Sequence, residues 1–398
     1  MDGPRWWREG SDQSTEVEGR LRAAWSKFGA LNEGLLDVAL SAGPLDEGSA
    51  SALLRRLVGH IQFSGLQLAG DPARPALINT QYSPWNWGHS NPDTLYLSAV
   101  IDDQHDYRVF GILGTAAQTT FGVYTGKADQ SHAVKVLAED LEIAADGSFE
   151  VFFTREARGG ANSCVLPEGA TSFASYQTFS DWETQVKGTI QIECLNPGEL
   201  PGPSSADDAI AAFEAHLDES RELFTMWVRD IPSNIFDTLP KNVALPPMQP
   251  PAAMAGAWFS PIPWELADGE ALIIDYTIPE GSPYVGICLT NRWSEMIDIE
   301  TRQTSLNLGQ SHRDGNTVRV LLSATDDGVQ NWLDTRGYGS GIVTWRATNP
   351  DAPAELTVTK IQAVEIDQHF DLNSRVTADQ RAAAIAVRRR HFALRNTP

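Results

Sequence analysis

The sequence predicts a mainly β protein with two tandem jelly-roll or β-sandwich domains and with N-terminal, interdomain and C-terminal helices. Short β-rich runs fill residues 95–195 and again residues 271–361, and turn residues such as Asp146-Gly147 separate them. The second set repeats the first, because residues 146–153 align with residues 314–321, and Asn162 then falls near Asn331. A duplicated β domain explains these matches, and their order, better than one large sheet.

The strands are expected where β-branched and aromatic residues alternate between turn signals. They cover residues 95–101, 107–113, 119–125, 141–144, 149–154, 172–179 and 188–195, then 271–278, 284–290, 317–323, 341–346 and 355–361.

Helices are predicted from apolar residues at helical spacing and from their start signals. The capping box Thr15-x-x-Glu18 opens the first helix, and a second follows Asp46. Ser205 opens a third, and Thr377-x-x-Gln380 caps the last. The Pro-rich residues 246–251 are typical of a stiff linker. The expected organisation is a helical preface (1–75), a first β-sandwich (76–200), a helix with its linker (201–250), a second β-sandwich (251–365) and a C-terminal helix (366–398).

Composition limits the partners. Fifty-two acidic residues against 30 Lys and Arg give a net charge of −22, which repels phosphate backbones and anionic membranes. We therefore expect neither nucleic acid nor a membrane as a partner, and we expect Arg388-Arg389-Arg390 to be a solvated helix face. Three cysteines and eight histidines, all scattered, predict no metal site. No leader or membrane-spanning run is recognised, so a cytoplasmic protein is expected.

Residues 82–96 concentrate more chemistry than any other segment, on backbone that two prolines and a glycine hold irregular. His89 could act as a general base, with Asp93 orienting it or acting as an acid. Tyr96 could donate a hydrogen bond to the substrate. The other expected binding residues here are Tyr82, Trp85, Trp87 and Asn91. Alternatively, Asn91-Pro92-Asp93-Thr94 is a turn in which Asn91 and Asp93 bond the local backbone.

Asp181 and Glu183 form a second candidate, in a loop between two predicted strands. On extended backbone the two carboxylates would project to one face, which suits acid/base catalysis or cation binding. The alternative is a solvated hairpin, since paired acids are common on exposed turns.

The second domain offers Arg292, which follows a predicted strand and could clamp a carboxylate, and the loop that contains Asn331 and Trp332. The Trp332 ring could supply an apolar or sugar-stacking wall. Alternatively, Trp332 plugs the sandwich and its neighbours are turn residues.

Three motifs together resemble a known family: Asn91-Pro92-Asp93-Thr94-Leu95-Tyr96, Asp181-Trp182-Glu183 and Asn331-Trp332-Leu333. They resemble bacterial proteins with the paired domains of unknown function numbered 1254 and 1214, over roughly residues 80–365 and most strongly in the C-terminal half. The resemblance implies a tandem jelly roll, like the double-barrel capsid proteins of large viruses. It implies no chemistry, and the stretch after Tyr107 lacks the paired tyrosines expected of the family.

The chain lacks a Gly-x-Ser-x-Gly elbow, a phosphate-binding loop, a dinucleotide fingerprint and a His-Glu-x-x-His helix. We therefore expect no cofactor. One hypothesis is a hydrolase, lyase or isomerase that acts by acid/base catalysis on a small neutral or weakly polar metabolite, carbohydrates and glycosides included. The alternative is a non-catalytic ligand-binding or assembly protein, since tandem jelly rolls readily form homo-oligomers.

Overall fold

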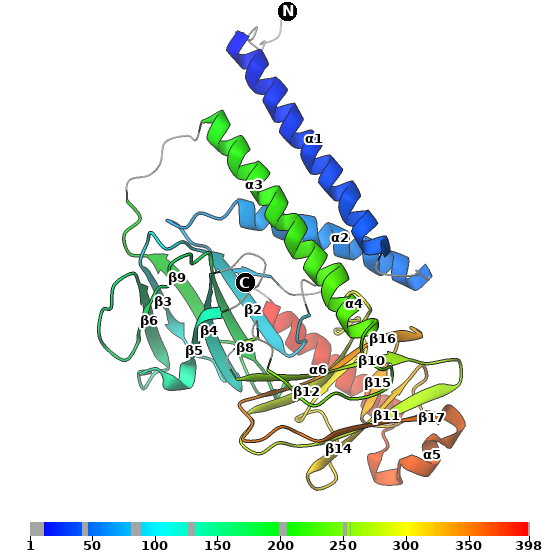
Figure 1. Ribbon diagram of the computed structural model, residues 1–398. Helices are drawn as coiled ribbons and strands as arrows, with labels where there is room; N and C mark the ends of the chain where they lie inside the picture. The colour runs from blue at the N-terminus through cyan, green and yellow to red at the C-terminus, as the bar shows by residue number, and fades with distance from the viewer. Residues whose placement is uncertain are drawn as a thin grey trace, which may run out of the picture.

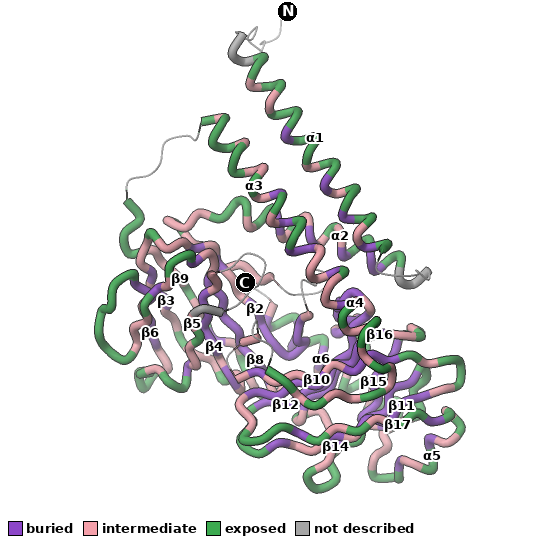
Figure 2. The backbone as a smooth tube through the Cα atoms, in the orientation of Figure 1, coloured by how far each residue is buried: buried purple, intermediate pink, exposed green. Residues whose placement is uncertain are grey.

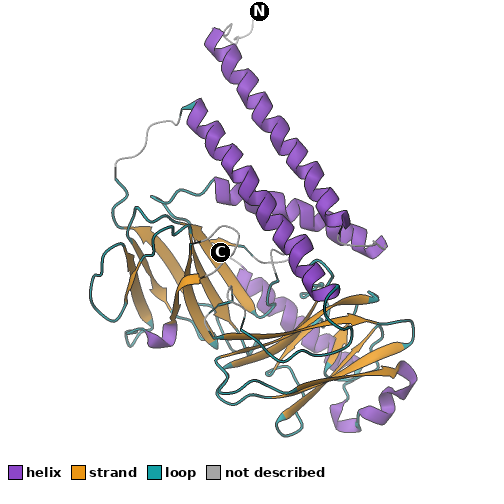
Figure 3. Cartoon of the chain, viewed as in Figure 1, coloured by secondary structure: helices purple, strands orange, loops and turns teal. Residues whose placement is uncertain are grey.

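The computed structural model describes residues 12–41, 47–80, 89–125, 132–198, 205–249, 253–254 and 256–396. Two β-sandwiches lie side by side, and a layer of helices covers one side of them (Figures 1 and 3). This confirms the predicted fold class of two β-sandwiches with N-terminal, middle and C-terminal helices. Among the described residues, no helix is long and apolar enough to cross a membrane.

In the first sandwich, a five-stranded sheet packs face to face with a four-stranded sheet. The strand orders are β1-β2-β8-β4-β5 and β7-β6-β3-β9. Inward-facing aromatic side chains such as Phe121, Phe153 and Phe173 fill the space between them. The strands are β1 (Ile78–Asn79), β2 (Thr94–Val100), β3 (Tyr107–Ile112), β4 (Gln118–Tyr124), β5 (His132–Leu137), β6 (Ser148–Thr154), β7 (Ser163–Val165), β8 (Ser172–Thr178) and β9 (Thr189–Cys194).

The second sandwich pairs the sheets β10-β16-β12-β13 and β15-β14-β11-β17. Its core is larger, and Trp264 and Trp345 lie fully buried in it. The strands are β10 (Ala257–Glu265), β11 (Glu270–Thr277), β12 (Tyr284–Thr290), β13 (Ser305–Asn307), β14 (Thr317–Ser323), β15 (Trp332–Asp334), β16 (Ser340–Thr348) and β17 (Leu356–Gln362).

The two sandwiches have the same topology. β3 pairs with β6 and β9 as β11 pairs with β14 and β17, and β7 runs parallel to β6 as β15 runs parallel to β14. The Phe152 amide donates to the Asn162 carbonyl, and the Leu321 amide donates to the Asn331 carbonyl, both at 2.9 Å. Asn162 and Asn331 are therefore equivalent. The predicted alignment of residues 146–153 was one residue out of register, because the turn before β14 has one more residue.

Two differences from the predicted strands have physical reasons. Residues 141–144 form no strand, since a 3₁₀ turn (Ala138–Asp140) ends there and leads into the hairpin. β10 was not predicted, because Pro261 and Pro263 argue against a strand. β10 lies at the edge of its sheet, where β16 is its one neighbouring strand and Met248 forms a single bridge to Phe259 on the other side. Pro261 and Pro263 therefore interrupt no hydrogen bonding between inner strands.

The helices are α1 (Asp12–Ser41), α2 (Glu47–Leu68), α3 (Ala206–Thr225), α4 (Ile231–Phe236), α5 (Ile366–His369) and α6 (Ala378–Asn396), and a π-helical turn (Met226–Asp230) joins α3 to α4. Ser205 caps α3 by accepting a hydrogen bond from the Asp208 amide, as predicted. Thr377 and Gln380 cap α6 with reciprocal bonds of 2.8 and 3.2 Å, also as predicted. The predicted start of the first helix was wrong, because Thr15 lies inside α1.

Two of the contacts between helices and sandwiches bear on the site. Trp293, in the loop after β12, is buried among apolar residues of α1, α2 and α3, including Leu35, Leu53 and Phe224. α6 lies along the junction of the two sandwiches, in red in Figure 1, whereas α1 and α3 run side by side and extend beyond them. Figure 2 shows α1 mainly exposed, whereas β12 and β16 of the second sandwich are almost entirely buried. Of the predicted site residues, Asn91, Asp93 and Asp181 lie at this junction beside α6.

Candidate functional site

The described part of the chemistry-rich segment, from His89 to Tyr96, lies between the two sandwiches. Tyr82, Trp85 and Trp87 lie outside the described residues.

Asn91 and Asp93 form the turn that the sequence analysis offered as an alternative. The Asp93 amide donates to Oδ1 of Asn91 at 3.0 Å, and the Asn91 amide donates to the Tyr96 hydroxyl at 2.8 Å. The turn also reaches the second sandwich: the Tyr284 hydroxyl donates to Oδ2 of Asp93 at 2.6 Å, and Nδ2 of Asn307 donates to Oδ1 at 3.0 Å. We call Asn91, Asp93, Tyr284 and Asn307 the junction cluster. All four side chains are buried.

Two buried arginines of α6 lie near this cluster. Arg395 donates to the Pro92 carbonyl, and Arg388 donates to the Ser305 hydroxyl and carbonyl at 2.7 and 2.6 Å. Burial lowers the pKa of each guanidinium to about 10. Burial raises the pKa of Asp93, and the Tyr284 hydrogen bond and the charge of Arg395 oppose that rise. The expectation of a solvated face was wrong for Arg388, while Arg389 and Arg390 are exposed.

His89 is partly buried against the second sandwich. Its Nε2 lies 2.5 Å from the Thr344 hydroxyl, and its carbonyl accepts a 2.7 Å hydrogen bond from Arg346 of β16. Burial, and then the charge of Arg346, lower the pKa of His89 well below its usual value. The imidazole is therefore neutral at physiological pH and is packed as an interface residue. His89 and Asp93 line neither of the two cavities described next.

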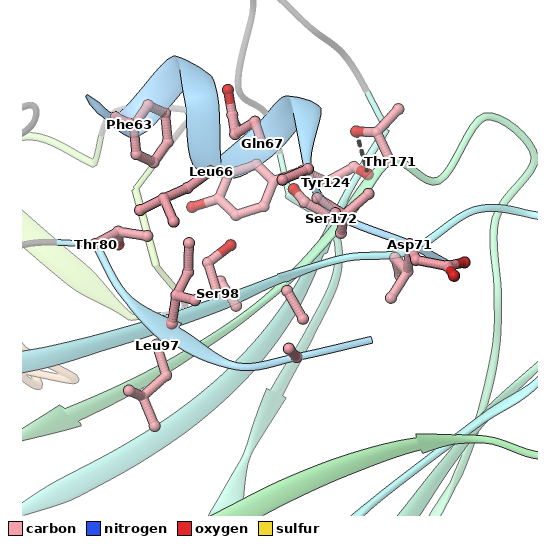
Figure 4. Close-up of a pocket in the computed structure, with 18 of the residues that line it drawn as sticks. Phe63, Leu66, Gln67, Asp71, Thr80, Leu97, Ser98, Tyr124, Thr171 and Ser172 are labelled. Carbon is pink, nitrogen blue, oxygen red and sulfur yellow. Dashed lines mark hydrogen bonds between the residues drawn. The ribbon is translucent and has the colours of Figure 1, made fainter. Parts of the chain in front are cut away.

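A cavity of about 820 Å³ separates α2 and α3 from the outer face of the five-stranded sheet. In Figure 4, Leu66 of α2 and Tyr124 of β4 meet in this space, with Thr80 and Ser98 on the strand side. Much of the wall is apolar, formed by Phe63, Leu66, Ile78, Leu97, Val100 and Leu223. We call this the first cavity.

Three tyrosines on adjacent strands line the first cavity: Tyr96 of β2, Tyr176 of β8 and Tyr124 of β4. Tyr96 lies directly opposite Tyr176, with ring centroids 5.3 Å apart and planes at 86°. The Tyr124 and Tyr176 hydroxyls are hydrogen-bonded to each other. Burial raises the pKa of all three phenols, so they stay protonated, and one proton of the Tyr124–Tyr176 pair is used in the bond between them. We call these residues the tyrosine trio.

The helical wall of the first cavity carries two serine–histidine pairs between α2 and α3. Ser64 Oγ lies 2.7 Å from Nε2 of His216, and Ser220 Oγ lies 2.8 Å from Nε2 of His60. Burial and the charge of Arg56 lower the pKa of His60 to about 3. A histidine that resists protonation so strongly is a poor proton acceptor for a serine nucleophile. The Ser220–His60 pair therefore serves best as a link between the two helices.

Asp181 and Glu183 line a second cavity, of about 520 Å³, beside α6. Residues 182–184 form a turn in which Asp181 accepts from the Thr184 hydroxyl at 2.5 Å and from the Glu183 amide at 2.8 Å. These bonds lower the pKa of Asp181. The sequence analysis assumed extended backbone at Asp181 and Glu183, which was wrong. The two carboxylates are therefore not brought to one face by the alternation of side chains along a strand. Trp182, between them, stacks on His391 of α6 with centroids 5.3 Å apart and planes at 12°.

The predicted residues of the second sandwich line neither cavity. The Arg292 guanidinium lies 5.9 Å from the centres of the Phe236 and Trp293 rings. Trp332 packs with Ile273 and Phe370 on the face of its sheet away from the sandwich core. Neither side chain belongs to the junction cluster or lines either cavity.

Asn331 bonds the backbone with its whole carboxamide. Its Nδ2 donates to the carbonyls of His312 and Arg319 at 2.7 and 2.9 Å, and its Oδ1 accepts from the His312 amide at 2.8 Å. Asn162 makes the equivalent bonds to Glu142 and Glu150 at 2.8–2.9 Å. The repetition of this clamp in both sandwiches supports the alternative that residue 331 holds a turn.

Sequence reasoning missed Tyr124, Tyr176 and Tyr284. The first two could have been found by placing outward-facing residues of neighbouring strands on one surface, since Tyr96, Tyr124 and Tyr176 all alternate with core residues. Tyr284 carried no local signal, because its partner Asp93 is 191 residues away.

The fold and cavities define a tandem β-sandwich protein with a helical layer and a closed polar junction. No model of a known family matches the chain, and no curated protein matches it. Among solved structures it is similar to an uncharacterized protein from Burkholderia cenocepacia, at 24% identity over 87% of this chain and 99% of that one, with a TM-score of 0.79. The VPA0106 protein from Vibrio parahaemolyticus is more distant, at 9% identity over 68% and 90% of the two chains, with a TM-score of 0.41. The first similarity shows a shared fold.

Proposed function

We propose that the protein binds a small, weakly polar molecule in the first cavity and needs no organic cofactor to do so. The observation that carries this proposal is the tyrosine trio on the wall of a cavity of about 820 Å³. Ligand sites usually measure roughly 300–1,000 Å³ and combine apolar walls with a few placed polar groups. The first cavity has this composition.

The lining indicates the kind of ligand. The phenols of the tyrosine trio remain neutral donors, so they suit a carbonyl, ether or hydroxyl oxygen. Asp71 and Arg74 line the same cavity, and they bond to each other at 2.6 and 2.8 Å. A charged ligand would therefore gain little binding energy from these two side chains, because they already neutralise each other. A largely apolar molecule with one or two oxygen acceptors fits best.

A neutral fluorescent probe, N-phenyl-1-naphthylamine, tests the proposal directly. We expect saturable binding with one site per chain and loss of that binding in Ser98→Phe, which fills the cavity. Competition by extracted metabolites, followed by native mass spectrometry, would identify the ligand. Tyr124→Phe with Tyr176→Phe should weaken the identified ligand more than the probe, while Tyr338→Phe, outside both cavities, should change neither. Equal probe binding by wild type and Ser98→Phe would refute the site.

Acid/base turnover of the bound molecule is the second candidate. It is favoured by the position of His216 and Glu219, which line the first cavity from α3, opposite the strands that carry the tyrosine trio. A phenol that donates to a substrate oxygen and an imidazole or carboxylate that moves a proton form a workable pair. The test is turnover of the identified ligand by wild type, Tyr176→Phe and His216→Gln. Equal turnover rates in the three proteins would rule out catalysis at this site.

Membership of the paired families of unknown function 1254 and 1214 is also our proposal. The duplicated sandwich topology supports it, because the resemblance implied two similar β domains in tandem. A sequence profile built from homologues of this chain would test it by matching or failing to match those families.

A further inference from the structure

The second cavity lies where three parts of the molecule meet. The loop between β8 and β9 contributes Asp181 and Glu183, the second sandwich contributes Gln310 and Gln330, and the first turn of α6 contributes Gln380. It shares no lining residue with the first cavity. Its volume of about 520 Å³ is also in the range of small-molecule sites, roughly 300–1,000 Å³.

The charges around the second cavity offset one another. Asp181 and Glu183 face two cations of α6, Arg381 and Arg388, which also line it. Arg381 donates to Asp326 at 3.0 Å and to Gln303 at 2.6 Å, and Arg388 is committed to Ser305. Neither guanidinium is therefore available to clamp an anion. The balance favours an uncharged ligand.

The glutamines supply oriented donors. Oε1 of Gln310 accepts from the Asn307 amide at 3.1 Å, and Oε1 of Gln380 accepts from the Thr377 amide at 2.8 Å. Each bond orients its carboxamide and leaves Nε2 as a donor. Across the described part of the chain, neither Nε2 nor the side chain of Gln330 makes a recorded hydrogen bond to protein.

The carboxylates supply the acceptors. The pKa of Asp181 is lowered by its bonds to Thr184 and Glu183, so this carboxylate stays ionised at neutral pH. Glu183 is exposed at the mouth of the cavity. Amide donors and carboxylate acceptors around one space match a ligand whose groups both donate and accept. Hydroxyl groups do this, whereas an amine only donates and a phosphate mainly accepts.

We propose that the second cavity binds a neutral polyhydroxylated molecule of the size of a monosaccharide or cyclitol. This is a site separate from the one assigned in the proposed function. One bound molecule would contact both sandwiches and α6 at once. Because such a ligand binds only the assembled junction, it should raise the unfolding temperature and protect α6 from proteolysis.

The test is titration of the full chain with D-glucose, D-mannose, D-galactose and myo-inositol at millimolar concentrations, followed by calorimetry and thermal unfolding. We expect at least one to give a saturable heat and a saturable thermal shift. Glu183→Gln and Gln330→Ala should weaken that binding roughly tenfold or more, since each removes a hydrogen-bonding group. Glu168→Gln and Gln191→Ala make the same chemical changes at exposed positions outside both cavities, and should leave the affinity unchanged.

Sugars also stabilise proteins without binding, through exclusion from the surface. A thermal shift that rises without saturation and is the same in wild type and Glu183→Gln would overturn the proposal. Tighter binding of spermidine or inorganic phosphate than of every polyol would overturn it as well, since the cavity would then select charge. N-phenyl-1-naphthylamine binding reports on the first cavity separately, so the two proposals can fail independently.

Discussion

The Tyr284 hydroxyl donates a 2.6 Å hydrogen bond to Oδ2 of Asp93, and this bond joins the second sandwich to the turn that begins the first. Both residues are buried, so the bond forms away from solvent. Gly286 makes room for it, because a Cβ there would lie 2.1 Å from the Tyr284 hydroxyl. The junction therefore depends on Asp93 and on two residues, Tyr284 and Gly286, that lie far from it in sequence.

Tyr284→Phe should destabilise the protein by about 1.5–3 kcal/mol, the usual contribution of a hydrogen bond to a charged group. The substitution keeps the ring and removes only the donor to Asp93. Urea unfolding, compared with Tyr338→Phe, measures the effect. Tyr338 is partly buried and has no recorded hydroxyl partner among the described residues. Equal midpoints for the two variants would show that the bond contributes nothing.

The raised pKa of Asp93 predicts a pH dependence. The folded protein holds this proton more tightly than the unfolded chain, whose pKa is near 3.8. Stability from this group is therefore present below pH 3.8 and is lost as the pH rises through the folded pKa. Asp93→Asn removes the titrating group. The free energy of unfolding of the wild type minus that of the variant should therefore fall as the pH rises from 3.8 through the folded pKa. Urea unfolding at several pH values measures it, and a difference that rises with pH would contradict the assignment.

Buried histidines predict the opposite slope at acid pH. Burial and the charge of Arg395 lower the pKa of His391 to about 4 from its usual 6.5. The unfolded chain then binds more protons, so stability falls as the pH drops from 6.5 toward 4. His391→Phe keeps a ring against Trp182 and should flatten this part of the stability profile. His369→Phe, for which no stacking partner is recorded in the described residues, should keep the wild-type slope.

The asparagine clamps should contribute to stability and not to binding. Asn331→Ala removes three hydrogen bonds at a buried position and should cost about 2–3 kcal/mol, and Asn162→Ala should cost less because Asn162 is half-exposed. The two lie in different sandwiches, so the costs should add in the double variant. Chemical unfolding measures the costs, and probe titration checks the affinity of the first cavity. Loss of probe affinity in Asn331→Ala would return residue 331 to the list of binding residues.

Trp182→Ala should loosen α6 from the junction. The ring stacks on His391, and the Arg388 guanidinium lies 4.7 Å from its centre, so its removal leaves a large space. Truncation of a buried Trp usually costs about 3–5 kcal/mol. Limited proteolysis should release α6 sooner than in wild type. Trp25→Ala on α1, where the side chain is 67% exposed, is the matched control and should cleave at the wild-type rate.

The sequence predicted those parts of the fold that depend on residues close together in the chain. The alternation of inward and outward residues located most strands, and the Ser205 and Thr377 caps located two helix starts. The duplication followed from comparing those local patterns. Pro261 and Pro263 misled the prediction of β10, because tolerance of proline depends on whether a strand lies at an edge.

The candidate site was predicted less completely, because its partners come from distant segments. Asp93 was predicted as a site residue, but the sequence does not show that Tyr284 and Asn307 form hydrogen bonds with it. The basic run at Arg388 was assigned to solvent, because a sequence shows no burial partner such as Ser305. Tyr176 belongs to no sequence motif. It becomes a candidate only because the fold places it beside Tyr96 and Tyr124 on the wall of the first cavity.

The matching outer faces of the two sandwiches make different contacts. The outer face of β2, β8 and β4 lines the first cavity with the tyrosine trio. The corresponding face of β10, β16 and β12 carries Arg346, which binds the carbonyls of His89 and Ser90. The same face therefore lies open to a cavity in the first sandwich and is closed by the chain itself in the second. Substitutions at matching positions should change the cavity in the first half and break the junction in the second.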